Sequence, residues 1–214
     1  MKKFVLLLAL ALTGFAANAQ IKRPKLVVGI IIDQMRWDYL NYYYDQYCDG
    51  GFKRLINEGF SCDNNMINYL PTVTAIGHTS TYTGATPAIH GIAGNSFQID
   101  GKDVYCCKDT TVESVGSKND AGRMSPCNLL STTIGDQIRL ATDFNSKVIG
   151  VALKDRAAIL PAGRSANAAY WYDTKAGKFV TSTYYMPQLP KWVDKFNGKI
   201  KIKPGTDPKM IPEG

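Results

Sequence analysis

The residues of this chain that could do chemistry begin with one carboxylate and one hydroxyl. Asp33 directly follows the apolar run of residues 26–32, and Thr74 comes 41 residues later, at the start of a segment rich in small residues. A threonine hydroxyl is a poor nucleophile unless a cation or a base removes its proton. Asp33 and Thr74 could therefore meet at one metal ion that activates the hydroxyl.

Both residues also have a simpler structural interpretation. Asp33 could be the N-cap of a helix that follows it, because Asp is a preferred residue at that position. Thr74 could be a capping hydroxyl at the start of a helix over residues 74–83. In the functional interpretation, the positive end of that helix favours a deprotonated Thr74 and an incoming phosphate together.

Three further polar residues could bind an anion. Lys154 and Arg156 occupy alternate positions around Asp155, so in an extended chain both side chains point to the same side. Two cations there would hold phosphate oxygens, and the guanidinium could bind two of them at once. The alternative is a pair of surface cations balanced by Asp155. Asn95 could donate its amide to a phosphate oxygen or simply form a turn.

Histidines and cysteines give little support for a metal site of their own. The chain has only two histidines, His78 and His90, too few for the rest of a zinc cluster. We expect His78, four residues after Thr74, to be a hydrogen-bonded core residue. The five cysteines include no C-x-x-C pair, their odd number leaves at least one thiol unpaired, and structural use is the expectation.

The expected strands place two of these residues at one edge of a sheet. Residues 26–32 are apolar on both faces and predict a central strand covered by helices, and residues 147–153 predict a second buried strand. Asp33 and Lys154 follow these strands, at the sheet edge where ligands gather in open α/β folds. The helix over residues 74–83, ended by Gly84, contains many weak helix formers and must be held by packing.

The other expected elements complete an α/β pattern. We expect a helix over residues 51–58 closed by Gly59, a strand over 60–69, a surface excursion or hairpin within 95–124, and a helix over 132–142 with Ile134, Ile138 and Ala141 on one stripe. The alternation of strands and helices predicts a mainly parallel, doubly wound sheet. Residues 199–214 carry no packing signal and look like a truncated loop or tail.

Residues 1–19 have the pattern of a secretory signal peptide. Two lysines precede thirteen mostly apolar residues and a small-residue cleavage site. We expect cleavage after Ala19 and a periplasmic or secreted mature chain. A membrane anchor is the alternative, but a span takes about 20 apolar residues. No later segment is apolar enough, so no membrane span is expected after cleavage.

The charge distribution argues against one class of partner. The net charge of +7 suits an anionic substrate, although solubility alone can explain such a surface. The basic residues are scattered, except for Lys199, Lys201 and Lys203 near the end, and the sequence shows no stripe of Lys and Arg of the kind that nucleic acid binding needs. We therefore expect no binding to nucleic acid polymers.

Four segments resemble one family: residues 28–40 (VGIIIDQMRWDYL), 71–80 (PTVTAIGHTS), 84–95 (GATPAIHGIAGN) and 153–161 (LKDRAAILP). They are similar to the N-terminal half of secreted bacterial alkaline phosphatases with a threonine nucleophile. These enzymes belong to the alkaline phosphatase superfamily, beside nucleotide pyrophosphatases and phosphodiesterases. The similarity covers about residues 25–196. It implies a doubly wound α/β fold with two zinc ions at one sheet edge.

The resemblance also implies roles for individual residues. Asp33 would be a zinc ligand, and Thr74 would be both the nucleophile and a zinc-contacting group. Asn95, Lys154 and Arg156 would contact the transferred phosphoryl group. The implied activity is zinc-dependent hydrolysis of small-molecule phosphate monoesters through a phosphothreonine, because the two cations can hold the extra charge of a terminal phosphoryl group. A phosphodiesterase or nucleotide pyrophosphatase, and a noncatalytic exported remnant, are the alternatives.

The chain departs from this family in one respect. Family members carry further Asp and His zinc ligands in their second half, and the chain ends before any of them. A zinc ion needs about four ligands, so Asp33 and Thr74 alone cannot hold two ions. We expect residues 20–198 to be the incomplete N-terminal part of a phosphatase catalytic domain, inactive by itself.

Overall fold

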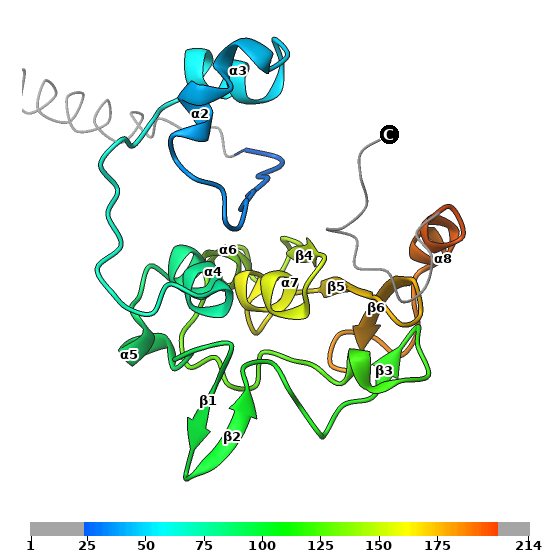
Figure 1. Cartoon of the computed structure of the whole chain (residues 1–214). Coiled ribbons are helices and arrows are strands. Elements are labelled where there is room, and N and C mark those ends of the chain that lie inside the picture. The colour runs from blue at the N-terminus through cyan, green and yellow to red at the C-terminus, as the bar shows by residue number, and fades with distance from the viewer. Residues whose placement is uncertain (1–23, 201–214) are drawn as a thin grey trace, which may run out of the picture. The chain divides into compact units, whose positions relative to one another are not determined.

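The computed structural model describes residues 24–200, and the chain divides into two units, Met1–Met35 and Arg36–Gly214. The predicted signal peptide, residues 1–19, lies outside the described residues, as do residues 201–214 of the predicted tail (Figure 1). Within residues 24–200, no helix is both long and apolar enough to cross a membrane.

The predicted central strand over residues 26–32 is wrong. These residues form neither helix nor strand, and Leu26, Val28 and Ile30 are 78%, 68% and 75% exposed. A strand is held by hydrogen bonds to a neighbouring strand. In the described part of the chain no strand pairs with this segment. Its apolar pattern alone therefore does not make it a strand, and Asp33 does not follow one.

The main sheet of the second unit is mixed. Its order is β3-β6-β5-β4, formed by Ser114–Val115, Lys178–Ser182, Ala168–Asp173 and Ile149–Ala152 in that order (Figure 1). β4 and β5 are parallel, whereas β5 with β6 and β6 with β3 are antiparallel. The chain crosses from β4 to β5 through α7 (Asp155–Ala162), but only a short turn joins β5 to β6, which forces an antiparallel pair. The described α/β sheet is therefore not mainly parallel.

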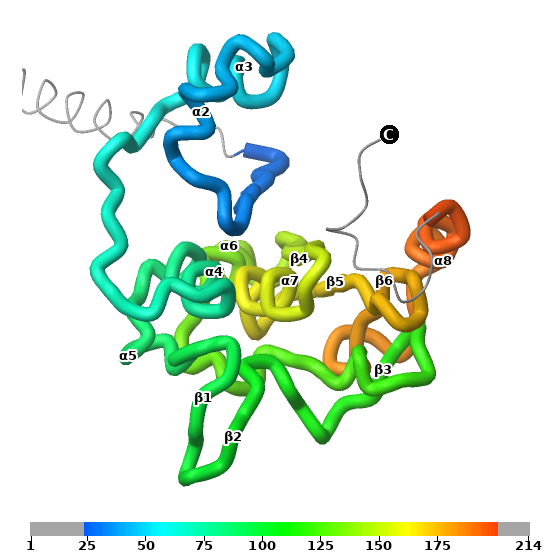
Figure 2. Tube along the Cα trace, viewed as in Figure 1, coloured from blue at the N-terminus to red at the C-terminus, as the bar shows by residue number. Residues whose placement is uncertain are grey.

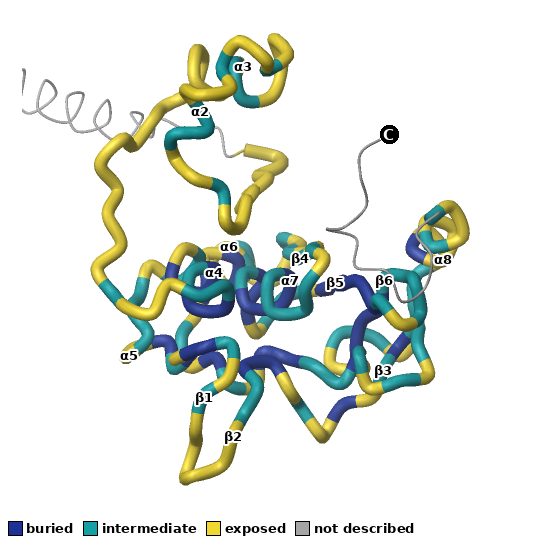
Figure 3. The backbone as a smooth tube through the Cα atoms, viewed as in Figure 1, coloured by how far each residue is buried: buried dark blue, intermediate teal, exposed yellow. Residues whose placement is uncertain are grey.

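The core of this unit surrounds β5 and α7. All six residues of β5 are buried, and the strand is drawn dark blue in Figure 3. α7 packs on β4 and β5. The approach is close at Gly150, where a Cβ atom would lie 2.1 Å from the carbonyl oxygen of Ala158. The main buried cluster consists of Ala75, Ile92, Cys106, Cys107, Leu129, Ala158, Ile159, Leu160, Ala169, Trp171 and Val180.

α4 (Thr74–Thr83) has the predicted bounds and ends at Gly84, whose φ of 66° is left-handed. Its weak helix formers are stabilised by hydrogen bonds and by packing, and packing is what the sequence predicts. The hydroxyls of Thr79, Thr81 and Thr83 each donate to the backbone carbonyl four residues earlier, which satisfies these polar groups along the helix. α4 also packs against α7, and the two helices lie side by side in Figure 2. Tertiary packing therefore outweighs poor intrinsic propensity.

Other predicted elements have mixed outcomes. α3 (Gly51–Glu58) is closed by Gly59, and residues 95–124 contain the predicted hairpin, formed by β1 (Ser96–Ile99) and β2 (Lys102–Tyr105). The strand predicted over residues 60–69 is wrong, because this exposed segment pairs with no strand in residues 24–200. The remaining elements are α2 (Tyr39–Tyr42), η1 (Tyr44–Gln46), α5 (Pro87–His90), η2 (Asp120–Gly122) and α8 (Lys191–Asn197).

α6 (Ile134–Ala141) and β4 form where predicted but bury different residues. Ile134, on the stripe expected to be apolar and covered, is 59% exposed, whereas Asp136 is buried. In β4, Ile149 and Val151 are 54% and 61% exposed. Within the described residues β4 is the last strand of its sheet. Ile149 and Val151 point to the same face of β4, and the described residues leave that face uncovered, so the predicted complete burial is wrong.

All five cysteines are free thiols. Cys106 and Cys107 are fully buried in the core cluster, with their sulfur atoms 3.9 Å apart. Burial raises the pKa of the Cys107 thiol, which keeps it neutral. These two side chains therefore serve as small core residues, in agreement with the structural use predicted for them.

Candidate phosphate-binding site

Thr74 is the first residue of α4, and Val73 occupies the N-cap position without a side-chain hydrogen bond. Thr74 therefore does not occupy the N-cap position of this helix. The first N–H groups of a helix have no partner within the helix and carry partial positive charge. Thr74 thus stands at a position that favours an anion.

The structure brings Asn95 to the same helix start. Its Oδ1 atom accepts a hydrogen bond from the backbone N–H of Ala75 at 3.0 Å. Because the carbonyl oxygen is used in this way, the Nδ2 donors of Asn95 face a different direction. The backbone carbonyl of Asn95 accepts from the N–H of Cys106 at 3.0 Å. Asn95 is therefore fixed between α4 and the end of β2.

Arg156 lies in the first turn of α7, beside a hydroxyl and a carboxylate. Its Nη1 atom donates to the hydroxyl oxygen of Tyr105 at 2.9 Å, and that hydroxyl donates to Oδ1 of Asp155 at 2.6 Å. The side chains of Arg156 and Asp155 are only 19% and 13% exposed. The alternative of an exposed surface cation therefore does not hold for Arg156.

One donor of this guanidinium is unsatisfied. The Nε atom of Arg156 is buried and has no hydrogen-bond partner among the residues that the structure describes. Burial by itself would lower the pKa of Arg156, but the hydrogen bond with Tyr105 and the charge of Asp155 outweigh it and raise the pKa. Arg156 is thus a permanent cation with a free buried donor. Such a donor could take an anion as its partner, although four other buried side-chain atoms of the described residues, among them Nε of Arg139, are unpaired in the same way.

Lys154 and Arg156 were predicted to lie in an extended chain, and the start of α7 shows a different conformation. Lys154 is the N-cap, in an extended conformation, but Asp155 and Arg156 are already helical. The helix begins here because the Asp155 carboxylate is favoured in the first turn and accepts from the N–H of Arg156 at 2.8 Å. The same-side arrangement predicted for an extended chain is therefore wrong. Both cations still lie at the N-terminal end of α7.

The two histidines have structural roles, as predicted for His78. The carbonyl oxygen of Thr74 accepts a hydrogen bond from Nδ1 of His78 at 2.9 Å. His90 is fully buried, with Nδ1 accepting from the N–H of Ile92 and Nε2 paired with the Ser80 hydroxyl at 2.9 Å. Burial lowers the pKa of His90 and keeps it neutral. These hydrogen bonds fix α4 and the segment that leads to Asn95.

Asp33 is exposed and lies in a turn with Gln34, whose φ is 63°. It is not an N-cap, because the next helix, α2, starts at Tyr39. Asp33 and Thr74 belong to different units, and their meeting at one metal stays a prediction. Among residues 24–200, no group of three or more His, Cys, Asp and Glu side chains could hold a metal ion. The described residues therefore do not form a complete metal site.

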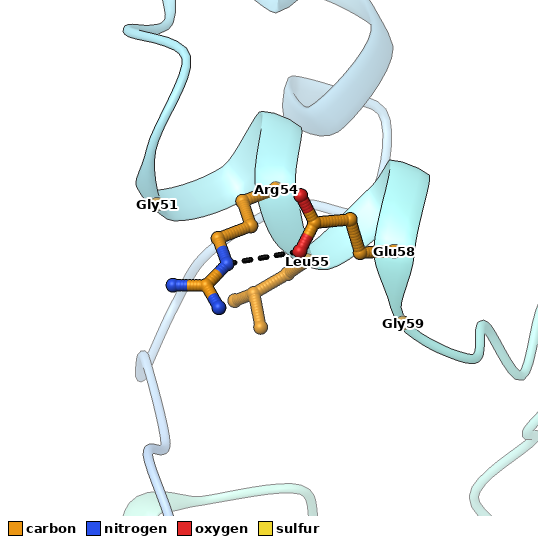
Figure 4. A pocket seen from close by; sticks show the side chains of 5 residues that line it. All are labelled: Gly51, Arg54, Leu55, Glu58 and Gly59. Atoms are coloured by element: carbon orange, nitrogen blue, oxygen red, sulfur yellow. Dashed lines mark hydrogen bonds and ion pairs between the residues drawn. The ribbon is translucent and has the colours of Figure 1, made fainter.

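A shallow hollow on α3 does not have the features of an active site. It is lined by Gly51, Arg54, Leu55, Glu58 and Gly59 (Figure 4). Its two charged side chains form an ion pair with each other at 3.0 Å, and both are more than two-thirds exposed. None of the predicted site residues lines it. The hydrogen-bonded network at α4 and α7 is the better candidate.

Sequence reasoning missed one member of this network. Tyr105 lies about 50 residues before Arg156 and ends a hairpin strand, and no local pattern marks it. The sequence presents Asp155 only as a charge that balances its neighbours. The hydrogen bonds between the two residues depend on the tertiary position of the hairpin, which a single sequence does not reveal.

Comparison with known proteins identifies the family. Residues 27–211 match the family model described as type I phosphodiesterase / nucleotide pyrophosphatase. The chain belongs to this family, within the alkaline phosphatase superfamily. The resemblance inferred from the four sequence segments is confirmed.

The similar curated proteins are bacterial. The chain is 56% identical to alkaline phosphatase PafA of Elizabethkingia meningoseptica over 92% of this chain and 37% of that protein. It is 59% identical to alkaline phosphatase PhoV of Synechococcus elongatus, over 84% of this chain and 33% of that protein. It is 60% identical to a protein of Myroides odoratus named calcium-transporting ATPase, over 85% of this chain and 33% of that protein. The chain thus spans about a third of the length of these relatives.

Solved structures give the same result for the fold. The crystal structure of wild-type PafA matches with a TM-score of 0.82 and 59% identity, over 84% of this chain and 35% of that one. A PafA mutant with Thr-to-Ser, Asn-to-Ala, Lys-to-Ala and Arg-to-Ala substitutions matches with a TM-score of 0.82, over 85% of this chain and 36% of that one. The described α/β structure therefore corresponds to part of the PafA fold.

Proposed function

We propose that the intact protein hydrolyses phosphate monoesters of small molecules through a phosphothreonine at Thr74. The observation that carries this proposal is the buried Nε of Arg156, which lacks a partner in the described residues. A phosphate oxygen would supply that partner. Two of the similar proteins are named alkaline phosphatases. The four residue types replaced in the PafA mutant also occur in the same chain order as Thr74, Asn95, Lys154 and Arg156.

In the proposed reaction two displacements follow one another. Thr74 gives its proton to solvent, its Oγ bonds to phosphorus, and the bond from phosphorus to the leaving alkoxide breaks in line with the attack. The alkoxide takes up a proton and departs as an alcohol. The oxygen of a water molecule then bonds to phosphorus and the bond from phosphorus to Oγ of Thr74 breaks. A proton of that water restores the Thr74 hydroxyl, and inorganic phosphate is released.

The side chains around Thr74 would hold the phosphoryl group in both steps. Nδ2 of Asn95 would donate to one equatorial oxygen, since Oδ1 already binds the N–H of Ala75. Arg156 would donate from Nε and from the rest of its free edge, and Lys154 would add a second positive charge. Charge on the equatorial oxygens dominates such reactions, so these donors would stabilise the transition state more than a neutral pocket could.

The family implies metal ions, and we propose two zinc ions for the intact protein. When bound, they would lower the pKa of the attacking group and stabilise the leaving oxygen. Asp33 and Thr74 would supply two contacts from this chain. A zinc ion needs about four ligands, and residues 24–200 contain no cluster that completes a site. The remaining ligands would have to come from elsewhere in the intact protein.

The preference for monoesters rests on charge. A terminal phosphoryl group carries more negative charge than a diester, and Arg156 and Lys154 add two positive charges at the N-terminal end of α7. The alternative is a phosphodiesterase or nucleotide pyrophosphatase, which the name of the matching family allows. A noncatalytic exported remnant is the alternative of another class. We also propose export to the periplasm or medium, on the sequence pattern of residues 1–19.

The direct test of this function is hydrolysis of an aryl phosphate by the purified intact protein. We expect turnover that dialysis against a chelator abolishes and that added zinc restores. Activity that survives complete metal removal would contradict the metal dependence. No turnover by protein that retains metal would favour the noncatalytic alternative.

Replacing Asn95 with aspartate should separate its two hydrogen-bonding roles. Asn95→Asp keeps an oxygen for the N–H of Ala75 but replaces the amide donor with a negative charge that repels phosphate. We expect kcat/KM for an aryl phosphate to fall by about 10²-fold or more, with a change in unfolding free energy within about 1 kcal/mol. Kinetics and urea unfolding measure the two effects. Wild-type kinetics in this variant would show that the amide does not contact the phosphoryl group.

A further inference from the structure

A single hydroxyl links the carboxylate of Asp155 to the guanidinium of Arg156. The Tyr105 hydroxyl donates to Oδ1 of Asp155 at 2.6 Å and accepts from Nη1 of Arg156 at 2.9 Å. Asp155 Oδ1 and Arg156 Nη1 are 4.0 Å apart, which is too far for a direct hydrogen bond. The orientation of Nη1 therefore depends on Tyr105, not on Asp155 alone.

This arrangement leaves one edge of the guanidinium for a ligand. An arginine side chain has several rotatable bonds, and ordering it for binding costs conformational entropy. The hydrogen bond from Nη1 to Tyr105 fixes the guanidinium plane, while the buried Nε is unpartnered among the described residues. A guanidinium held in this way presents Nε together with its neighbouring amino group, which is the geometry for bidentate binding of two phosphate oxygens.

The hairpin that carries Tyr105 also fixes Asn95. Tyr105 ends β2, and the N–H of the next residue, Cys106, donates to the backbone carbonyl of Asn95 at 3.0 Å. Cys106 is fully buried in the core cluster, and Tyr105 packs against that cluster. The end of β2 therefore sets the position of two phosphate-binding candidates on different elements.

The Tyr105 hydroxyl keeps its proton under ordinary conditions. Burial, and then the negative charge of Asp155, raise the pKa of Tyr105 far above its usual value, and the hydrogen bond from Arg156 offsets only part of this. A protonated hydroxyl can donate to the carboxylate and accept from the guanidinium at the same time. Both hydrogen bonds of the Tyr105 hydroxyl, to Asp155 and from Arg156, are therefore present throughout the pH range in which such an enzyme would be assayed.

We infer that Tyr105, together with Asp155, is a positioning residue that holds Arg156 in the orientation required to bind the phosphoryl group. This inference rests on the proposed function of Arg156. Neither Tyr105 nor Asp155 needs to touch the substrate. Removal of the Tyr105 hydroxyl should therefore act through Arg156 and should have no separate effect once Arg156 is gone.

The test is a double-mutant cycle in the intact protein, with Tyr105→Phe, Arg156→Ala and the combined variant. We expect Tyr105→Phe to lower kcat/KM for an aryl phosphate monoester by about tenfold and to weaken binding of inorganic phosphate by a similar factor. In the Arg156→Ala background the same change should alter both quantities by less than about twofold. A structural role alone would not produce this dependence on Arg156.

Tyr185→Phe is the matched control. Tyr185 packs against the same core cluster, and its buried hydroxyl has no hydrogen-bond partner within residues 24–200. Its removal should change kcat/KM by less than about twofold. Thermal melting verifies that each variant is folded. Should Tyr105→Phe fail to fold, Asp155→Asn is the second variant, because it removes the charge of the carboxylate that accepts from Tyr105. We expect its effect on kcat/KM also to disappear in the Arg156→Ala background.

The outcomes separate this inference from the function on which it rests. A large loss in Arg156→Ala with no loss in Tyr105→Phe would overturn the positioning role and leave the proposed function standing. Independent, multiplicative effects of the two changes would also overturn it. Unchanged turnover and phosphate affinity in Arg156→Ala would show that Arg156 does not bind the phosphoryl group, and both proposals about this residue would then fall.

Discussion

Replacing Thr74 with valine is expected to lower kcat/KM for an aryl phosphate monoester by about 10³-fold or more, because a nucleophile is lost from the proposed reaction. Valine keeps the β-branched shape of threonine and removes only the hydroxyl. Val73 rather than Thr74 occupies the N-cap of α4, so the substitution leaves the N-cap residue unchanged. Steady-state kinetics of the intact protein measure the loss.

Thr74→Ser is the control for this prediction. It keeps a hydroxyl at the start of α4, and the hydrogen bond from His78 to the backbone carbonyl of residue 74 is unaffected by either substitution. We expect Thr74→Ser to stay within about tenfold of the wild-type rate. Near wild-type turnover by Thr74→Val would contradict the assignment of Thr74 as the nucleophile.

The second large effect is expected on stability, at Asp136. This carboxylate is 3% exposed. Its two oxygens accept from the backbone N–H groups of Thr133, Arg164 and Ser165 and from the hydroxyls of Thr133 and Ser165. These bonds tie the start of α6 to the segment after α7. We expect Asp136→Ala to lower the unfolding free energy by about 3–5 kcal/mol, because several buried donors lose their acceptor.

Urea unfolding of the intact protein measures this loss, and Asp49→Ala is the control. Asp49 is exposed, so its removal should change the unfolding free energy by less than about 0.5 kcal/mol. Equal effects of the two substitutions would contradict the role given to Asp136.

The pH dependence of stability provides an independent check on Asp136. Burial alone would raise the pKa of Asp136, but the hydrogen bonds from Ser165, Thr133 and Arg164 outweigh it and lower the pKa below the ordinary value of 3.8. The stabilisation from Asp136 is therefore present above that value and is lost as the pH falls through the pKa of the folded state. We expect Asp136→Asn to be less sensitive to acid than the wild type.

The elements that sequence reasoning located well are those with strong local signals. α4 begins and ends at its predicted residues. Its end is marked by Gly84, because a glycine adopts the left-handed conformation at little cost. Gly59 ends α3 in the predicted place, and the hairpin falls within the predicted polar segment. The family resemblance assigns Asn95 and Arg156 to the site. In the structure Arg156 donates to the Tyr105 hydroxyl, and the next residue, Cys106, donates to the backbone carbonyl of Asn95.

The elements that sequence reasoning placed wrongly depend on distant partners. Residues 26–32 have the apolar pattern of a buried strand but pair with no strand in the described part of the chain. The mixed direction of the sheet follows from the short turn between β5 and β6, which was not foreseen. Tyr105 was missed because its partners are about 50 residues away. Such pairings follow from tertiary structure and not from local pattern.

The most direct test of the central claim is the ratio of kcat/KM for an aryl phosphate monoester to that for the methyl diester with the same leaving group. The intact protein should prefer the monoester, because Arg156 and Lys154 favour the more negative group. Arg156→Ala should reduce this ratio by about tenfold or more. A preference of the wild-type protein for the diester would contradict the proposed monoesterase and favour the phosphodiesterase alternative.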